Sequence, residues 1–353
     1  MQISWECGSA YDFFTSLHVL HDPERFGLRG AWAAGVRSRL PLEARKVLEQ
    51  ADQAFFVPLH WIHALPEPRS AAIALQHLAA IPAAKRLAAL FFSPSVDEAM
   101  RALLRGVAQR GQWSDDDLTT LRSMRKEKNW NTQRDVLEGI LSAWAAQETF
   151  GERLLPALQT YHEVFFDEEE NRILPALEQA LKKARELSTA IPAAQLLETL
   201  SQGVRFSTDL LTENLILVPS YWLSPLVIFQ RVSADTWLLL FGGRPDDVSL
   251  VPGELVPDAL LRVLKALSDP TRLRILRYIS HTPMTPSALA RKLRLRAPTV
   301  VHHLNILRLA GLVYLNLDIA GNKNERLYVA RLEMVQQSLS LLETFLSGNE
   351  TEE

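Results

Sequence analysis

Apolar residues recur at helical spacing along residues 257–310, and turn signals divide this stretch into short helices. Two of them are expected to begin at Asp269-Pro270 and Thr285-Pro286, because an acidic or hydroxyl side chain caps a first turn and proline fits its first position. The predicted helices cover residues 257–267, 270–279, 286–293 and 298–310. The second is expected to bury Leu273, Leu276 and Ile279 and to direct Arg272, Arg274 and Arg277 elsewhere.

The fourth predicted helix has two faces of different character. Val300, Leu304 and Leu307 are spaced i, i+4 and i+7 and are expected to face inward. His303 is expected to pack against the domain, and the helix should stop at Gly311, a residue type that readily adopts the left-handed conformation after a helix. The side chains expected on or near the opposite face are Thr299, Val301, His302 and Asn305.

Two alternating runs of apolar and polar residues follow and predict a β-hairpin. Residues 312–317 and 325–329 flank Gly321–Asn324, a strong turn sequence that carries Lys323. A last helix is expected over about 331–346. Its apolar stripe consists of Leu332, Val335, Leu339, Leu342 and Leu346.

The charge of the chain is strongly segregated. Residues 258–332 contain thirteen Lys and Arg against four Asp and Glu, a net charge of +9, whereas the whole chain carries −3. The remaining residues therefore sum to −12. Such a separation predicts that one part of the protein faces a polyanion and that another part avoids it.

The order helix, helix, turn, helix and basic hairpin is that of a winged helix-turn-helix, in which one helix enters the major groove and the wing reaches the flanking backbone. The block resembles the ArsR-type winged-helix repressors in four segments: LKALSDPTRLRIL (264–276), SALARKL (287–293), PTVVHHLNILRLAGLV (298–313) and RLYVA (326–330). Together they span residues 264–330, about a fifth of the chain. The resemblance implies a homodimer that binds a palindromic operator in double-stranded DNA.

The resemblance also indicates which residues make each contact. The expected DNA contacts are Arg296, Thr299, Val301, His302, Asn305, Lys323 and Arg326. The first and last helices of the block would form the dimer interface, with Leu260, Leu264, Leu332, Val335, Leu339 and Leu342. Arg296-Ala297 departs from the family, which usually has Ser before the recognition helix. A capping side chain is lost there, and Arg296 is free to lie against a phosphate.

Metal sensing at the positions used by this family is not expected. Members that sense metal often carry a Cys pair in the third helix, or His and acidic ligands in the last helix. Here residues 285–289 contain no Cys and residues 331–346 contain no His. His60 and His63 have an i, i+3 spacing that could ligate a metal, but no companion acid is evident, so packed or exposed histidines are preferred. No metal site and no cofactor are predicted.

The N-terminal part has a different pattern. Residues 9–202 are predicted to form a series of helices, several of them beginning at a proline. Strands are predicted over residues 3–6, 213–218, 226–230 and 236–241. We expect a small antiparallel sheet attached to a helical bundle, followed by a loose linker to the basic block that opens with residues Gly242 to Asp247. The fold class is mainly α, with a helical domain over 1–250 and a winged helix-turn-helix domain over 251–348.

Composition and motifs exclude several classes of protein. Cys7 is the only cysteine, so no intrachain disulfide can form. The first residues lack the basic start and long apolar core of a signal peptide, and the apolar stretch 215–229 is too interrupted to span a bilayer. P-loop, G-x-G-x-x-G, G-x-S-x-G and H-E-x-x-H motifs are absent.

Asp167–Glu170 is interpreted as a solvated helix start favoured by the helix dipole.

These observations predict a cytoplasmic, homodimeric DNA-binding regulator, a repressor by resemblance and not an enzyme. Its N-terminal domain would sense a small molecule or support dimerisation. Two alternatives stay open for residues 1–250, namely an enzyme or a protein-docking module that the winged helix targets to DNA. A large apolar pocket lined by Trp and Tyr would favour sensing, and a flat apolar patch would favour docking. No nucleophile–base pair supports an enzyme.

Overall fold

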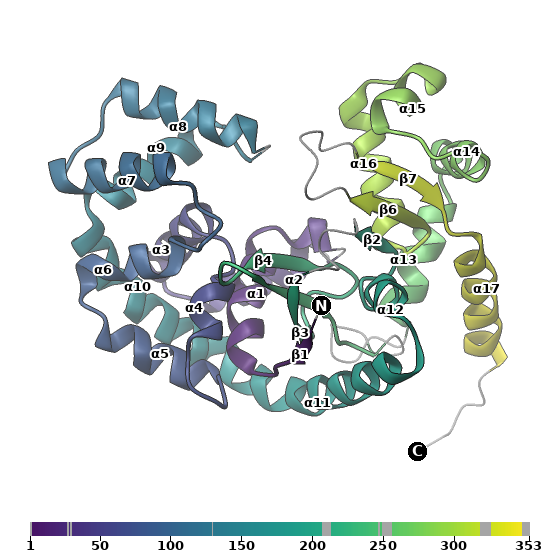
Figure 1. Cartoon of the computed structure of the whole chain (residues 1–353), viewed down its shortest axis with the longest axis horizontal. Helices are drawn as coiled ribbons and strands as arrows, with labels where there is room; N and C mark the ends of the chain where they lie inside the picture. The colour runs from purple at the N-terminus through teal and green to yellow at the C-terminus, as the bar shows by residue number, and fades with distance from the viewer. Residues whose placement is uncertain are drawn as a thin grey trace.

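The structure is a computed structural model that describes residues 2–26, 28, 30–128, 130–206, 213–245, 248, 256–317 and 326–347. Helices dominate it, which confirms the predicted fold class. They form a large N-terminal bundle and a smaller C-terminal group (Figure 1). None of the helices among the described residues combines the length and the apolar composition that crossing a bilayer requires.

The N-terminal bundle is organised around its first helix. Eleven of the thirteen residues of α1 are buried, so this helix is enclosed on nearly all sides and lies inside the bundle. Several helices begin directly after a proline, as predicted, namely after Pro41, Pro58, Pro82 and Pro192. The Ser114 hydroxyl caps α8 in a capping box with Asp117. The elements are α1 (Ser9–His21), η1 (Pro23–Phe26), α2 (Gly30–Arg39), α3 (Leu42–Ala54), α4 (Leu59–His63), α5 (Ala71–Ala80), α6 (Ala83–Phe91), α7 (Glu98–Arg110), α8 (Asp115–Glu127), α9 (Arg134–Ala145), α10 (Gln147–Tyr161), η2 (His162–Phe166), α11 (Asp167–Ala190) and α12 (Ala193–Leu200).

A four-stranded sheet packs beside this bundle, and its strand directions correct one prediction. The strands β1 (Ile3–Trp5), β3 (Asn214–Ser220), β5 (Thr236–Gly242) and β4 (Ile228–Arg231) are neighbours in that order. The expected antiparallel pairing is wrong for β1–β3 and β3–β5, which are parallel, and holds for β4–β5. The apolar pattern marks a strand but not its direction. Residues 215–220 of β3 are continuously buried, as is typical of strands in parallel sheets.

A buried carboxylate fixes α1 to the end of β3. Asp12 is fully buried and accepts hydrogen bonds from Ser220 Oγ at 2.7 Å and from the N–H groups of Trp222 at 3.0 Å and Tyr221 at 3.2 Å. Burial raises the pKa of Asp12 from 3.8 to about 6, while these hydrogen bonds favour the ionised form.

Asp12→Asn should remove a pH dependence of stability. Because the folded-state pKa lies above the unfolded value of 3.8, the stabilising contribution of Asp12 is fully present below 3.8 and is lost as pH rises through about 6. The shift corresponds to about 3 kcal/mol at most. Denaturant titrations between about pH 4 and pH 7 should show the free energy of unfolding of the wild type falling relative to that of the variant. Parallel pH profiles would contradict this account.

The C-terminal elements follow in the predicted order and enclose a hydrophobic core of their own, drawn from residues between Val263 and Ala330. The predicted caps are confirmed, since Asp269 accepts the Arg272 N–H and Thr285 accepts the Ala288 N–H. The elements are α13 (Asp258–Leu267), α14 (Pro270–Ile279), α15 (Pro286–Leu293), α16 (Ala297–Leu309), β6 (Val313–Leu317), β7 (Leu327–Ala330) and α17 (Leu332–Ser347). This is a winged helix-turn-helix.

The orientation of α14 differs from the prediction. Leu273 is 48% exposed, and Ile275 is fully buried together with Leu276 and Ile279. The observed buried residues are spaced i, i+1 and i+4, which also places them on one side of a helix. Helical spacing alone therefore does not distinguish the observed buried face from the predicted one, and the packing of the domain decides between these two faces. Arg272 does not point away from the domain. Its Nε and Nη2 donate to the carbonyls of Ala266 and Lys265, both at 2.7 Å, and so cap the end of α13.

A strand from the N-terminal part completes the wing sheet. β2 (Val204–Phe206) pairs in parallel with β6, so the sheet order is β2-β6-β7. Gly203 precedes it with φ +105°, a conformation that favours glycine, and its carbonyl accepts the Leu315 N–H at 2.9 Å. Three residues are too few to show alternation, so the sequence did not predict β2. Residues on both sides of position 250 therefore share one sheet.

The expected loose linker after β5 is ordered at its start. Gly242 ends β5, and Arg244 is 7% exposed, with its guanidinium 3.3 Å from the carboxylate of Asp258 in α13. Asp246 and Asp247, which end the opening stretch of that predicted linker, lie outside the described residues. A buried ion pair therefore attaches the start of the C-terminal group to the end of the first sheet.

Helices α10 and α11 are continuous, joined by the π-helical turn η2. The interpretation of Asp167–Glu170 as a helix start is wrong in one respect, because the Asp167 N–H donates to the His162 carbonyl. These acidic residues therefore follow a preceding helical turn and do not lie at a free N-terminus. The dipole of a free helix end does not account for them.

Candidate DNA-binding site

The helix α16 presents a mixed polar face to solvent. Val300, Leu304 and Leu307 are each fully buried, as their spacing predicts. His303 has a side chain only 14% exposed, with Nδ1 3.9 Å from the Asp269 carboxylate, so it packs on the domain as expected. The residues predicted for the opposite face are all exposed, namely Thr299, Val301, His302 and Asn305. Hydroxyl, methyl, imidazole and amide groups are those that can contact base edges in a major groove.

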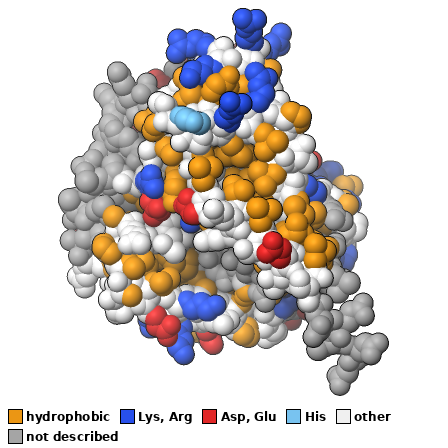
Figure 2. Space-filling view, turned by 90° about the vertical axis from the view of Figure 1, so that its right-hand side faces the viewer, with side chains coloured by type: hydrophobic (Ala, Val, Ile, Leu, Met, Phe, Trp, Pro, Cys, Tyr) orange, Lys and Arg blue, Asp and Glu red, His pale blue; other side chains and the backbone are white. Residues whose placement is uncertain are grey.

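Exposed cations lie beside the N-terminal end of α16. Arg291 and Lys292 end α15, Arg294 lies in the turn, and Arg296 is the N-cap residue of α16, without a side-chain capping hydrogen bond. All four are exposed, and the ion pairs formed within the described part of the C-terminal group do not include them. Free helical N–H groups together with cations favour a phosphate. Lys and Arg side chains gather at the end of the molecule where Figure 1 places α15 (Figure 2).

The wing is described in part. β6 and β7 pair antiparallel, with Val313 opposite Ala330 and Asn316 opposite Leu327, which confirms the predicted hairpin arms. Lys323 and the turn that carries it lie outside the described residues. Arg326, immediately before β7, is exposed. Of the two wing cations predicted to contact DNA, the structure thus places Arg326.

Known proteins share this part of the chain. Residues 267–314, from the end of α13 into β6, match the helix-turn-helix domain family. The transcriptional repressor SdpR of Bacillus subtilis (strain 168) is 41% identical over 51 residues, which are 14% of this chain and 57% of that protein. An uncharacterized HTH-type transcriptional regulator of Methanocaldococcus jannaschii is 35% identical over 72 residues, which are 20% of this chain and 76% of that protein. The chain belongs to the helix-turn-helix transcriptional regulators.

Each of these matches covers a fifth of the regulator or less, and the chain spans somewhat more than half the length of the Bacillus protein. The likeness therefore concerns the DNA-binding part. The described structure itself shows how this part joins the rest of the regulator, through a residue near the end of α16.

Arg308 of the regulator connects the recognition helix to the N-terminal bundle. It is only 6% exposed, and its guanidinium donates to the carbonyls of Ser201 at 2.5 Å and Gln202 at 3.1 Å, just after the end of α12. Burial lowers the pKa of Arg308 to about 10, so the side chain stays charged at neutral pH. The prediction did not single out Arg308, although position 308 continues the inward-facing series of Val300 and Leu304.

A second contact lies next to this one. The guanidinium of Arg205, in β2, is 3.8 Å from the ring centroid of Tyr314 in β6 and donates to Glu198 of α12 at 2.6 Å. β2 itself is hydrogen-bonded to β6. Both α16 and the wing are therefore held by the same short segment, residues 198–206.

The dimer residues predicted for the regulator fall into two groups. On α17, Leu332, Leu339 and Leu346 are 55%, 52% and 72% exposed, and Leu264 of α13 is 40% exposed. Val335 and Leu342 are half-buried. Figure 2 shows a broad apolar area on the side of the molecule where α17 lies. Leu260, in contrast, is 1% exposed and packs within its own chain, so it has no surface to offer a partner.

An open cavity of about 340 Å³ lies at the surface of the regulator's bundle, between α1, α2 and α3. Leu20, Leu40 and Leu48 form part of its wall, and Arg37 and Arg45 are among its charged lining residues. This volume lies in the range of small-molecule sites. Its lining includes neither Trp nor Tyr and so differs from the Trp- and Tyr-lined pocket that we considered from the sequence.

His60 and His63 do not form a shared site. His60 Nε2 donates to the Ala89 carbonyl at 3.0 Å, and His63 Nδ1 lies 2.8 Å from a Glu6 carboxylate oxygen. Each imidazole thus has a separate partner within the bundle. The preferred interpretation of these two residues as packed side chains agrees with these contacts.

Replacing Arg308 with Met should destabilise the regulator. Methionine fills a similar volume but leaves the two carbonyls after α12 without their donor, which costs roughly 1–3 kcal/mol for a buried acceptor. Denaturant titration of the full chain measures this loss. Arg291→Met, which removes an exposed cation of the same domain, should change the free energy of unfolding by less than about 0.5 kcal/mol. Equal effects of the two substitutions would show that the Arg308 contacts contribute nothing.

Proposed function

We propose that this regulator is a transcriptional repressor of the ArsR type, which binds a palindromic operator as a homodimer. The observation that carries the proposal is the exposed polar face of α16, flanked by exposed cations on α15 and in the turn before α16. In a winged helix-turn-helix, such a helix lies in the major groove. SdpR, one of the similar proteins, is named a transcriptional repressor.

Each exposed residue of this face has a defined role in the proposal. Thr299 and His302 donate or accept hydrogen bonds at base edges, and the methyl groups of Val301 contact a thymine methyl group. Asn305 reaches the last base of the half-site. Arg296, the turn cations and Arg326 bind phosphates and set the register of the protein on the duplex, which supplies affinity but no sequence information.

His302→Ala should relax sequence preference, whereas Arg326→Ala should not. Loss of one base-edge contact removes about 1–3 kcal/mol of discrimination at one position. Loss of one phosphate contact reduces the magnitude of the slope of log K against log salt concentration by roughly 0.9, and it weakens binding to all DNA sequences alike. Selection from random duplex DNA, followed by salt titrations with the full chain, distinguishes these effects. An unchanged preference in His302→Ala, or binding that is insensitive to salt, would refute the assignment.

The apolar face of α17 and Leu264 of α13 form the proposed dimer interface. Leu332, Leu339 and Leu346 are each more than half exposed in a single chain, and exposed leucines in one stripe favour burial against a second copy. A two-fold dimer places two α16 helices at half-sites about 34–36 Å apart. The operator is therefore an imperfect palindrome.

Leu339→Glu should convert the dimer to a monomer. The substitution places a charge in an apolar contact without a partner, at a cost of several kcal/mol. Gln337→Glu, which adds the same charge at an exposed position off the stripe, should remain dimeric. Analytical ultracentrifugation of the two full-length variants makes the comparison, and circular dichroism confirms that both are folded. A wild-type chain that is monomeric at tens of micromolar would reject this interface.

We propose that residues 1–250 sense a small molecule and that residues 251–348 bind DNA. The cavity between α1, α2 and α3 supports the sensing role, because its volume suits a small molecule. The contacts that residues 198–206 make with Arg308 and with β6 provide a physical route from the bundle to α16 and the wing. The matched relatives are named as a transcriptional repressor and a transcriptional regulator, which supports a regulatory function for the protein.

A further inference from the structure

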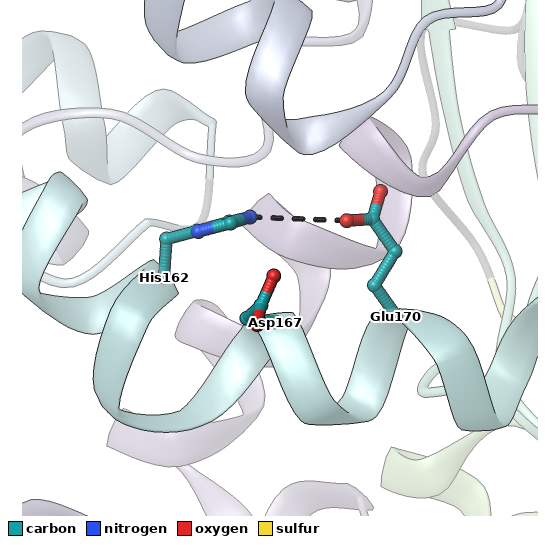
Figure 3. A group of neighbouring side chains, drawn as sticks. All are labelled: His162, Asp167 and Glu170. Carbon is teal, nitrogen blue, oxygen red and sulfur yellow. Dashed lines mark ion pairs between the residues drawn. The ribbon is translucent and has the colours of Figure 1, made fainter.

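Three potential metal ligands converge where α10 meets α11. The side chains of His162, Asp167 and Glu170 point toward one another (Figure 3). One ligand atom from each lies within 4.8 Å of the other two, and His162 Nε2 is 3.8 Å from Glu170 Oε2. Two ligand atoms bound to one zinc ion lie roughly 3.3 Å apart in tetrahedral geometry. Small side-chain rotations are therefore enough to bring all three to bonding distance.

The π-helical turn η2 creates this convergence. Residues five positions apart in a regular α-helix are separated by about 140° around the axis, so an α-helical His162 would face away from Asp167. In η2, the hydrogen bond from the Asp167 N–H to the His162 carbonyl spans five residues and brings them onto one face. Asp167 and Glu170, spaced i, i+3, already share that face. Such turns are rare in helices and frequent at functional sites.

The surroundings of His162 and Glu170 differ from those of side chains in a solvated acidic cluster. His162 Nε2 is buried and has no hydrogen-bond partner within the described chain, whereas buried imidazole nitrogens are normally hydrogen-bonded. Glu170 Oε1 accepts hydrogen bonds from the Ser9 hydroxyl and, at 3.4 Å, from the Ala71 N–H. These bonds hold the carboxylate in place while its Oε2 is the oxygen nearer to His162.

We propose that His162, Asp167 and Glu170 bind one divalent first-row transition-metal ion of the zinc or manganese(II) type. One imidazole and two carboxylates supply nitrogen and oxygen donors without sulfur, a set that suits these ions and not soft ones. Asp167 is exposed, so the ion reaches the site from solvent and keeps water in its remaining positions. The bound ion fastens α10 to α11 across the π turn.

The test uses the full chain, stripped of metal with a chelator and titrated with Zn²⁺ or Mn²⁺ by isothermal calorimetry in the absence of DNA. One ion per chain is expected. His162→Gln and Asp167→Asn should each weaken binding about 100-fold or more, because loss of a supporting contact alone costs 10–100-fold in other metal sites. Glu168→Gln, which removes an exposed charge from the same helical turn, should bind metal as the wild type does.

Two results would overturn the proposal, namely a wild-type chain that binds neither ion at micromolar concentration and substitutions that all leave the affinity unchanged. Asp167 is exposed, so Asp167→Asn keeps the packing of the helix, and thermal melts without metal confirm that each variant is folded. Since no DNA is present, the outcome does not depend on the proposed operator binding, and either proposal can fail alone.

Discussion

The buried guanidinium of Arg308 is the contact on which the position of the DNA-binding face depends. A charged group that is 6% exposed must be satisfied, and here the carbonyls of Ser201 and Gln202, at the electronegative end of α12, satisfy it. The same segment continues into β2, which adds a strand to the wing sheet. The recognition helix and the wing are therefore positioned by the N-terminal bundle as well as by their own core.

This arrangement offers a physical route for the sensing role that we propose for the N-terminal bundle. The long helix α11 begins at the cluster of His162, Asp167 and Glu170, the last two of which lie in its first turn. It is followed by α12, and the carbonyls that accept from Arg308 come directly after α12. A ligand in the bundle changes DNA binding only if it binds one arrangement of this segment more tightly than another. A shift of α12 would move the Arg308 acceptors and β2 together, so the helix and the wing would respond as one unit. Metal or small-molecule binding that left α12 in place would not alter operator affinity.

Local signals in the sequence predicted local structure well. Asp269, Thr285 and the i, i+4, i+7 series of Val300 fixed helix starts and the inward face of α16, because each depends only on neighbouring residues. The direction of β5 relative to β3 and the pairing of β2 with β6 depend on residues far apart in the chain and were not predictable. The acidic run at Asp167 was misinterpreted for a related reason, because nothing in its composition announces a π turn.

The exposed face of α16 could be predicted from the sequence. In the sequence, Arg308 is one of many cations of the basic block, and only its burial in the structure distinguishes it from them. Burial thus separates the residues that we propose to contact DNA from the residue that positions α16. Photo-crosslinking tests the reading role most directly, with a benzophenone amino acid at position 302 or, as a control, at the exposed position 152 of α10. With duplex DNA selected by the wild-type protein, position 302 should crosslink to bases within the selected site and position 152 should not. Crosslinks from position 152, or none from position 302 in a variant that still binds, would contradict the account.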